Sequence, residues 1–298
     1  MEQAARQFLG AASAEERGAA ERLLLDFRKS ATPLAVCRHL LLHSSVGFAK
    51  LQALCTMREC LGTLWAALQP AERSELQLLL LRLVANEDGG AAEQYVIAAA
   101  AQLLAVHAKH DLVRSTDSGG GVAVSTLIDG ASQMLHQPGG AHADAAIAVL
   151  NALLTEFGAP SAGAMGGGLP WSMHAPARQR FEEHHLLAVA ALVVQYLQRL
   201  HHAALSAATP PVAALPPPLA HAITQCASLL CTALSWEFGG IGEAAASDAP
   251  RPGLNATVVR PPASADGWMA LLRGGEALGA VADLLEQSAM AARGGGEG

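Results

Sequence analysis

The chain has 298 residues, of which 51% are hydrophobic, 4% aromatic and 15% charged, and its formal net charge is -7. An average globular domain carries about 25% charged residues, so this surface is poor in charge. The shortage of aromatic and β-branched runs excludes an all-β fold, and an acidic chain without a basic stripe excludes ordinary nucleic-acid binding.

Apolar residues recur at three- and four-residue spacing, which is typical of amphipathic helices. In the first half this spacing predicts helices at residues 1–9, 14–30, 33–41, 46–68, 71–84, 93–110, 122–136 and 142–157. Ser13 and Glu16 predict a capping box at the start of helix 14–30. Pro33 then predicts a kink between that helix and the next one. The inner faces of helices 14–30 and 46–68 are expected to contain Leu23, Leu24, Phe27, Leu51, Leu54, Leu61 and Leu64.

The second half predicts helices at 178–205, 219–238 and 268–292. The predicted helices are joined by short turns and form two-helix units of about 40 residues with no strand between them. Each unit has to bury its apolar face against the next one. The pattern therefore predicts an all-α fold, a HEAT-repeat α-solenoid of antiparallel helix pairs. An irregular helical bundle is the alternative.

Four segments rich in Gly, Pro, Ala and Ser interrupt the helices, at 115–121, 158–177, 207–218 and 239–267. They contain too little apolar surface to offset the entropy of ordering, so we expect flexible insertions there and a disordered tail at 293–298. This gives N-terminal HEAT repeats at 1–157, a flexible insertion at 158–177 and further HEAT-type helices at 178–292. The tail lacks a polar capping helix, so we expect the chain to be the front part of a longer solenoid.

The longest apolar runs are about half the roughly 20 residues that span a bilayer, or less, so we expect no membrane insertion. The N-terminus lacks the basic and then apolar order of a secretory signal. All five cysteines lie in apolar helical segments, and we expect buried, reduced thiols of a cytosolic or nuclear protein. They are Cys37, Cys55, Cys60, Cys226 and Cys231.

Histidine pairs are the main candidates for metal chemistry. His39 and His43 lie one helical turn apart, as zinc ligands can, but the glutamate of a His-Glu-x-x-His site is absent. The other pairs have no cysteine or carboxylate to complete a ligand set, so we expect polar surface positions. They are His107 and His110, His184 and His185, and His201 and His202. The sequence therefore predicts no catalytic residue, no metal site and no cofactor, although a helical metalloenzyme stays open as an alternative.

Four sequence blocks resemble one protein family. The first combines Ala20–Ser30 with Pro33, Ala35, Val36, Cys37, His39 and Leu40. The others are Leu150–Phe157, Arg180–Glu183 and Leu234–Phe238. Together they resemble the N-terminal HEAT repeats of the exportin-4 branch of the importin-β superfamily of nuclear transport receptors. The glycine- and alanine-rich insertions depart from the family pattern.

The resemblance implies a nuclear export receptor, or karyopherin, that shuttles between nucleus and cytoplasm. Such a receptor binds protein cargo together with the GTP form of the small GTPase Ran, and it contacts nuclear pore proteins. The branch is associated with a hypusine-bearing translation factor and with some transcription regulators as cargo. The alternative is a HEAT or armadillo scaffold that binds proteins without Ran.

Candidate partner-binding residues follow from the same resemblance, because Ran docks against inner helices of the first few repeats in this superfamily. Glu72, Glu75, Glu87 and Asp88 lie on and just after predicted helix 71–84, where acidic groups can meet a basic patch. Arg28 and Lys29 belong to the first matching block. Arg28 and Lys29 fit equally well as C-terminal charges that complement a helix dipole. The alternative for the four acidic residues is that they are ordinary solvated residues.

Overall fold

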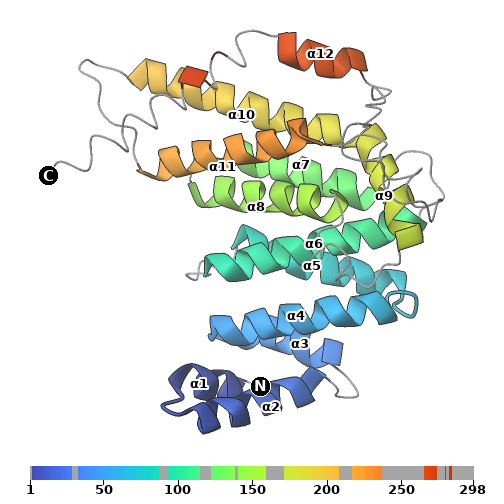
Figure 1. Cartoon of the computed structure of the whole chain (residues 1–298), viewed down its shortest axis with the longest axis vertical. Helices are drawn as coiled ribbons and strands as arrows, with labels where there is room; N and C mark the ends of the chain where they lie inside the picture. The colour runs from blue at the N-terminus through green and yellow to red at the C-terminus, as the bar shows by residue number, and fades with distance from the viewer. Residues whose placement is uncertain are drawn as a thin grey trace, which may run out of the picture. The chain divides into compact units, whose positions relative to one another are not determined.

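The computed structural model describes residues 2–28, 33–86, 93–114, 122–137, 140–158, 171–207, 217–236, 265–273, 279 and 282–283. Every regular element within these ranges is a helix (Figure 1). The helices are α1 (Glu2–Gly10), α2 (Ala14–Arg28), α3 (Pro33–His43), α4 (Gly47–Leu64), α5 (Pro70–Ala85), α6 (Gln94–Arg114), α7 (Val122–His136), α8 (Gly140–Phe157), α9 (Trp171–His184), α10 (Leu186–Ala207), α11 (Pro217–Leu234) and α12 (Ala265–Arg273). The prediction of an all-α chain is confirmed over this part of the sequence.

The chain forms two compact units, which divide between His110 and Asp111 inside α6. Unit 1 contains α1 to α5 and the first part of α6, and unit 2 contains the described residues from Asp111 onward. The division that the sequence suggested, with HEAT repeats at 1–157, stays a prediction.

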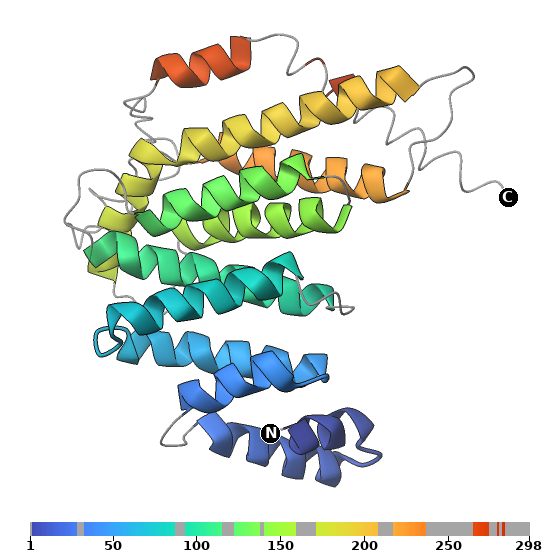
Figure 2. The same ribbon diagram turned by 180° about the vertical axis from the view of Figure 1, so that it is seen from behind.

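In unit 1, consecutive helices pack in pairs: α1 lies against α2, and α3 lies against α4 (Figures 1 and 2). One of the two bonds of the predicted capping box at α2 is present: the Ser13 hydroxyl accepts the backbone N–H of Glu16 at 3.1 Å. The Glu16 carboxylate accepts the N–H of Ala12 at 2.9 Å, so it reaches one residue further back than a standard box. The bond from Glu16 to Ser13 satisfies an N–H group that the first turn of a helix leaves unpaired.

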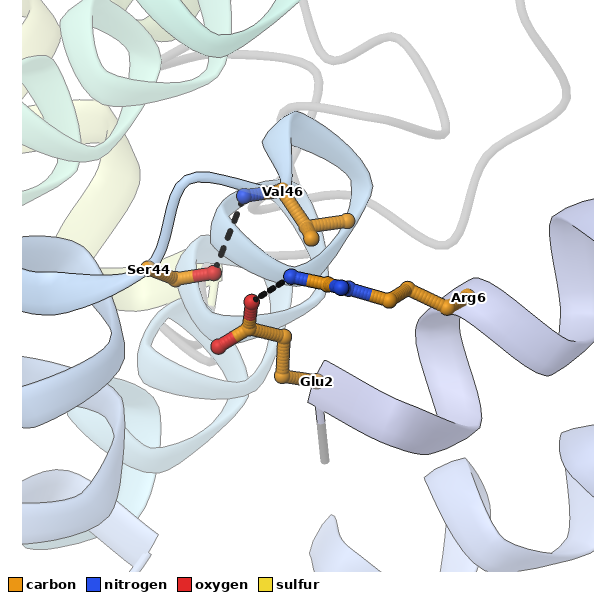
Figure 3. A network of polar contacts seen from close by, with 4 residues as sticks. All are labelled: Glu2, Arg6, Ser44 and Val46. Atoms are coloured by element: carbon orange, nitrogen blue, oxygen red, sulfur yellow. Dashed lines mark hydrogen bonds and ion pairs between the residues drawn. The ribbon is translucent and has the colours of Figure 1, made fainter.

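Figure 3 shows two short local contacts in the N-terminal part of unit 1. The hydroxyl of Ser44 accepts the N–H of Val46 at 3.1 Å in the turn between α3 and α4. Within α1, the guanidinium of Arg6 donates to the Glu2 carboxylate at 2.7 Å. Both groups of this pair are solvated, so it contributes at most about 0.5 kcal/mol.

The structure corrects several predictions for unit 1. Helix α4 ends at Leu64 instead of residue 68, because the chain turns at Trp65–Leu68 with N–H groups of Ala67 and Leu68 bonded to the Leu64 carbonyl. Leu64 itself is 39% exposed and Leu23 is 55% exposed, so neither lies on an inner face as expected. Leu24, Leu54 and Leu61 are buried as predicted. The predicted kink before Pro33 falls on residues 29–32, which lie outside the described residues.

In unit 2, α7 packs on α8 and α10 packs on α11, while α10 also contacts α7 and α11 also contacts α8. Helix α9 contacts α8 and α10. Most residues of α8 are buried, including its apolar positions from Ala143 to Phe157. A helix that is apolar around most of its circumference belongs in a core, so α8 is the centre of this unit.

Two helix boundaries in unit 2 also differ from the predictions. The helix expected at 178–205 is divided at His185 into α9 and α10. Helix α9 begins at Trp171, so the end of the predicted insertion 158–177 is helical, with Pro176 inside the helix. Helices α11 and α12 likewise begin before the predicted residues, at Pro217 and Ala265. The predicted insertions at 115–121 and 239–264 and the predicted tail at 293–298 lie outside the described residues.

Candidate protein-binding surface

Two predicted contact residues, Glu72 and Glu75, lie on one exposed face of α5, since residues three apart are neighbours on a helix. Glu72 also caps its own helix: its carboxylate accepts the N–H of Gln69 at 2.8 Å, in a capping box that places Pro70 at the first helical position. The local sequence thus explains where α5 begins and why Glu72 stands at its first turn.

Glu75 forms an ion pair with Arg38 of α3, with a distance of 2.7 Å between Arg38 Nη2 and Glu75 Oε2. The side chains are 39% and 59% exposed, respectively. An ion pair this solvated stabilises a fold by less than about 1 kcal/mol. It mainly fixes the position of two opposite charges on the surface formed by α3 and α5.

A groove lies beside this ion pair, within unit 1. It has a volume of about 300 Å³ and is formed by α3, α4, α5 and the turn before α5. We call it the α3–α5 groove. Its lining residues are Pro33, Leu34, Ala35, Arg38, Met57, Leu64, Leu68, Glu72 and Leu76. The groove therefore joins an apolar lining to the charged groups of Arg38 and Glu72.

The remaining predicted contacts are not placed by the structure. Glu87, Asp88 and Lys29 lie outside the described residues, and Arg28 is the last residue of α2, with a side chain outside them too. Their proposed role stays a prediction.

Arg38, Met57 and Leu68 were not singled out from the sequence, whereas Leu64 was expected on the inner face of its helix. Met57, Leu64 and Leu68 are seven and four residues apart, which places them along one stripe of a helix and its exit. The sequence spacing shows this apolar stripe, but it does not indicate that α3 and α5 pack so as to leave part of the stripe exposed in a groove.

Trp65 is the centre of a second cluster in unit 1, which we call the Trp65 cluster: Trp65, Arg73, His107 and His110. The Arg73 guanidinium lies over the Trp65 ring, 5.0 Å from its centroid. It also donates a hydrogen bond of 3.1 Å to the backbone carbonyl of Trp65. His107 meets the indole edge-on, with ring centroids 4.6 Å apart, and His110 stacks on it at 5.0 Å. His107 and His110 are 4% and 2% exposed, so the prediction that they are surface residues is wrong, as it also is for His185 of unit 2 at 5%.

The burial of His107 alters its chemistry. Burial, with a smaller effect of the nearby Arg73 charge, lowers the pKa of the imidazole to about 4, against a raising effect of the hydrogen bond to the Arg73 carbonyl. That bond, 3.1 Å from His107 Nε2, is donated by the ring because a carbonyl can only accept. His107 is therefore neutral at pH 7 and serves packing.

The cysteines and the other histidines do not gather into a metal-ligand cluster in the part of the chain that the structure describes. No group of three or more His, Cys, Asp or Glu side chains suited to a metal ion occurs there. Burial raises the pKa of the Cys37 and Cys226 thiols to about 12, which keeps both protonated. Cys231 is exposed, contrary to the prediction of buried thiols, and Cys55 and Cys60 are half-buried.

Unit 2 contains a cluster that joins residues of the last three resembling blocks to Arg178. We call it the Trp236 cluster: Phe157, Arg178, Phe181, Glu182 and Trp236. Phe157 and Phe181 stack at 4.5 Å, and Phe181 lies 5.8 Å from the Trp236 ring. The Glu182 carboxylate accepts bonds of 2.8 Å from Arg178 and from the indole N–H of Trp236. Arg178 also lies over the indole at 4.8 Å. These blocks therefore meet in a core and build the fold there.

Among the described helices, α6 alone is long and apolar enough to cross a membrane, with a mean hydropathy of 1.2 over its most apolar window. Of that window, 72% is buried inside the protein. A buried core helix passes the same test, so this is weak evidence for a span.

No known protein-family model matches the chain.

Proposed function

We propose that this chain is a nuclear export receptor of the exportin-4 branch of the importin-β superfamily, and that its helices form an α-solenoid of antiparallel HEAT-type pairs. It binds protein cargo and the GTP form of Ran, contacts nuclear pore proteins, and shuttles between nucleus and cytoplasm. It has no catalytic activity of its own and needs no cofactor.

The order of helix contacts in unit 2 carries the architectural part of this proposal. Helices α7 and α8 form one pair, and α10 and α11 form another; α10 then packs on α7, and α11 packs on α8. Equivalent helices of successive pairs contact each other in a solenoid. A surface built this way suits a protein partner, because it is long and needs no enclosed cavity.

The acidic face of α5 supports the Ran part. Glu72 and Glu75 are exposed and fixed in place, the first by its capping bond and the second by Arg38. Carboxylates held beside a groove can meet a basic patch on a partner without a further ordering cost, and such complementarity speeds association.

A retention experiment tests the proposal. Immobilised Ran loaded with a non-hydrolysable GTP analogue should retain the full chain, and Ran loaded with GDP should not. We expect the double charge reversal E72K/E75K to reduce retention at least about tenfold. The matched double reversal E21K/D26K, on exposed positions of α2, should leave it unchanged.

The outcomes separate the two candidate functions. Equal retention by both nucleotide forms favours the scaffold that binds proteins without Ran. Retention by neither form contradicts the Ran part, and equal effects of the two double variants contradict the assignment to α5.

A further inference from the structure

The α3–α5 groove combines a largely apolar lining with a defined arrangement of charge. Seven of its nine lining residues are apolar, and only Arg38 and Glu72 are charged. Met57 and Leu76 are buried, while Leu64 is 39% exposed. Apolar surface left in contact with water favours an occupant that displaces that water.

The size of the groove limits the occupant. A volume of about 300 Å³ is at the lower end of the range for ligand pockets. It accepts a few side chains and not a whole domain. An amphipathic helix presents such a set, because apolar residues at i, i+3 and i+4 project from one face.

The charges around the groove are not balanced. The guanidinium of Arg38 is engaged by Glu75, whereas the Glu72 carboxylate accepts only the neutral N–H of Gln69. No cationic side chain pairs with Glu72 among the residues that the structure describes. Arg38, Glu72 and Glu75 together carry one net negative charge, so the complementary partner carries a positive charge beside its apolar residues.

We propose that the α3–α5 groove binds an amphipathic helical segment of a partner protein. Its apolar side chains enter between α3 and α5, and a lysine or arginine one turn away meets Glu72. This inference rests on the proposed protein-binding function, but it does not depend on Ran.

Two fluorescein-labelled peptides of about 14 residues, or four turns, test this proposal on the full chain. Both carry the same leucine face at i, i+4 and i+7; one has lysines beside this face and the other has glutamates. Fluorescence anisotropy should show the lysine peptide binding at least about tenfold more tightly than the glutamate peptide. The variant E72K should reverse this preference.

A matched pair of variants separates the groove from the rest of α3. Ala35 lines the groove and is exposed, so A35W fills the space without entering the core. Val36 is the next residue, is 37% exposed and does not line the groove. We expect A35W to weaken lysine-peptide binding at least about tenfold and V36W to leave it unchanged. In the unmodified chain, the peptide should also shift the NMR signal of the Met57 methyl group.

Three results would overturn the groove proposal: no binding of either peptide, equal affinity for both peptides, or equal weakening by A35W and V36W. Ran retention is a separate measurement. If the peptides fail to bind while the GTP form of Ran still retains the chain, the groove proposal fails and the proposed function stands. If the lysine peptide binds and neither form of Ran retains the chain, the groove proposal stands and the Ran part of the proposed function fails.

Discussion

Each of the two units contains an arginine packed on a buried tryptophan, but the residues around this pair differ between the units. In both, an arginine lies over a buried tryptophan, at 5.0 Å in the Trp65 cluster and 4.8 Å in the Trp236 cluster. The Trp65 cluster completes this pair with two buried histidines. The Trp236 cluster completes it with the Glu182 carboxylate and two phenylalanine rings.

The difference lies in how each arginine charge is held. Arg178 is 3% exposed and is paired with Glu182 at 2.8 Å, so it has a carboxylate partner inside the core. Arg73 is half-buried and donates to the neutral carbonyl of Trp65. A buried charge needs a hydrogen-bonded counter-charge, whereas a charge near water does not. The same aromatic contact is thus accompanied by a carboxylate in unit 2 and by two buried histidines in unit 1.

The largest expected effect comes from removing either indole. Trp65 and Trp236 are 1% and 7% exposed, so W65A and W236A each leave a large cavity. We expect each to lower the free energy of unfolding by about 3–5 kcal/mol. Urea unfolding followed by circular dichroism measures this loss of unfolding free energy. A loss below about 1 kcal/mol would show that these rings are not core residues.

The second largest expected effect is a pH dependence of stability that comes from His107 in the Trp65 cluster. The unfolded pKa of His107 is near its ordinary value of 6.5, and the folded pKa is about 4. As pH falls through this window, the unfolded chain binds a proton that the folded chain rejects, so stability falls. The full penalty, reached below pH 4, is roughly 3 kcal/mol and is zero above pH 6.5.

The variant H107Q should flatten this part of the pH profile, measured by urea unfolding at pH 4.5, 5.5 and 7. The matched control H43Q changes an exposed histidine and should keep the His107 contribution. An unchanged slope in H107Q, or a slope lost in H43Q, would contradict the assignment.

Changing each tryptophan to phenylalanine gives a smaller expected effect, and the comparison of W236F with W65F isolates the indole hydrogen bond. The Trp236 indole donates to Glu182, whereas the Trp65 indole N–H has no hydrogen-bond partner among the described residues. A hydrogen bond to a charged group contributes about 1.5–3 kcal/mol. W236F should therefore cost about 2 kcal/mol more than W65F in urea unfolding. Equal costs would mean that the bond to Glu182 contributes nothing.

The smallest expected effect is at the surface ion pair of the groove. E75Q removes the charge that holds Arg38, and both groups are solvated. We expect less than about 1 kcal/mol of stability loss, decreasing with added salt. A loss above 2 kcal/mol would show that the pair supports the α3–α5 contact and does more than fix surface charge.

Helix positions were predictable from the sequence because apolar spacing and capping residues are local signals. Ser13 with Glu16 located the start of α2, and the predicted helix 71–84 begins within one residue of α5. The predicted single helix across His185 was wrong, because α9 ends at His184 and α10 begins at Leu186. Hydrogen bonds of the helical type still flank the division, from the N–H of His185 to the Phe181 carbonyl and from that of Val189 to the His185 carbonyl. An apolar pattern does not register such a division.

Burial was harder to predict than helix position. His107 and His110 are polar residues whose burial depends on Trp65 and Arg73, which lie on other elements far away in the sequence. The two glutamates of α5 were identified as candidates by position, but their groove depends on how α3 and α4 pack beside them. Tertiary packing of this kind leaves no local signal.

The affinity of the purified chain for Ran in its two nucleotide forms tests the proposed function most directly. Isothermal titration calorimetry should give a dissociation constant at least about tenfold lower for the GTP-analogue form than for the GDP form, a difference of about 1.4 kcal/mol. Equal dissociation constants, or no measurable heat with either form, would contradict a Ran-controlled export receptor.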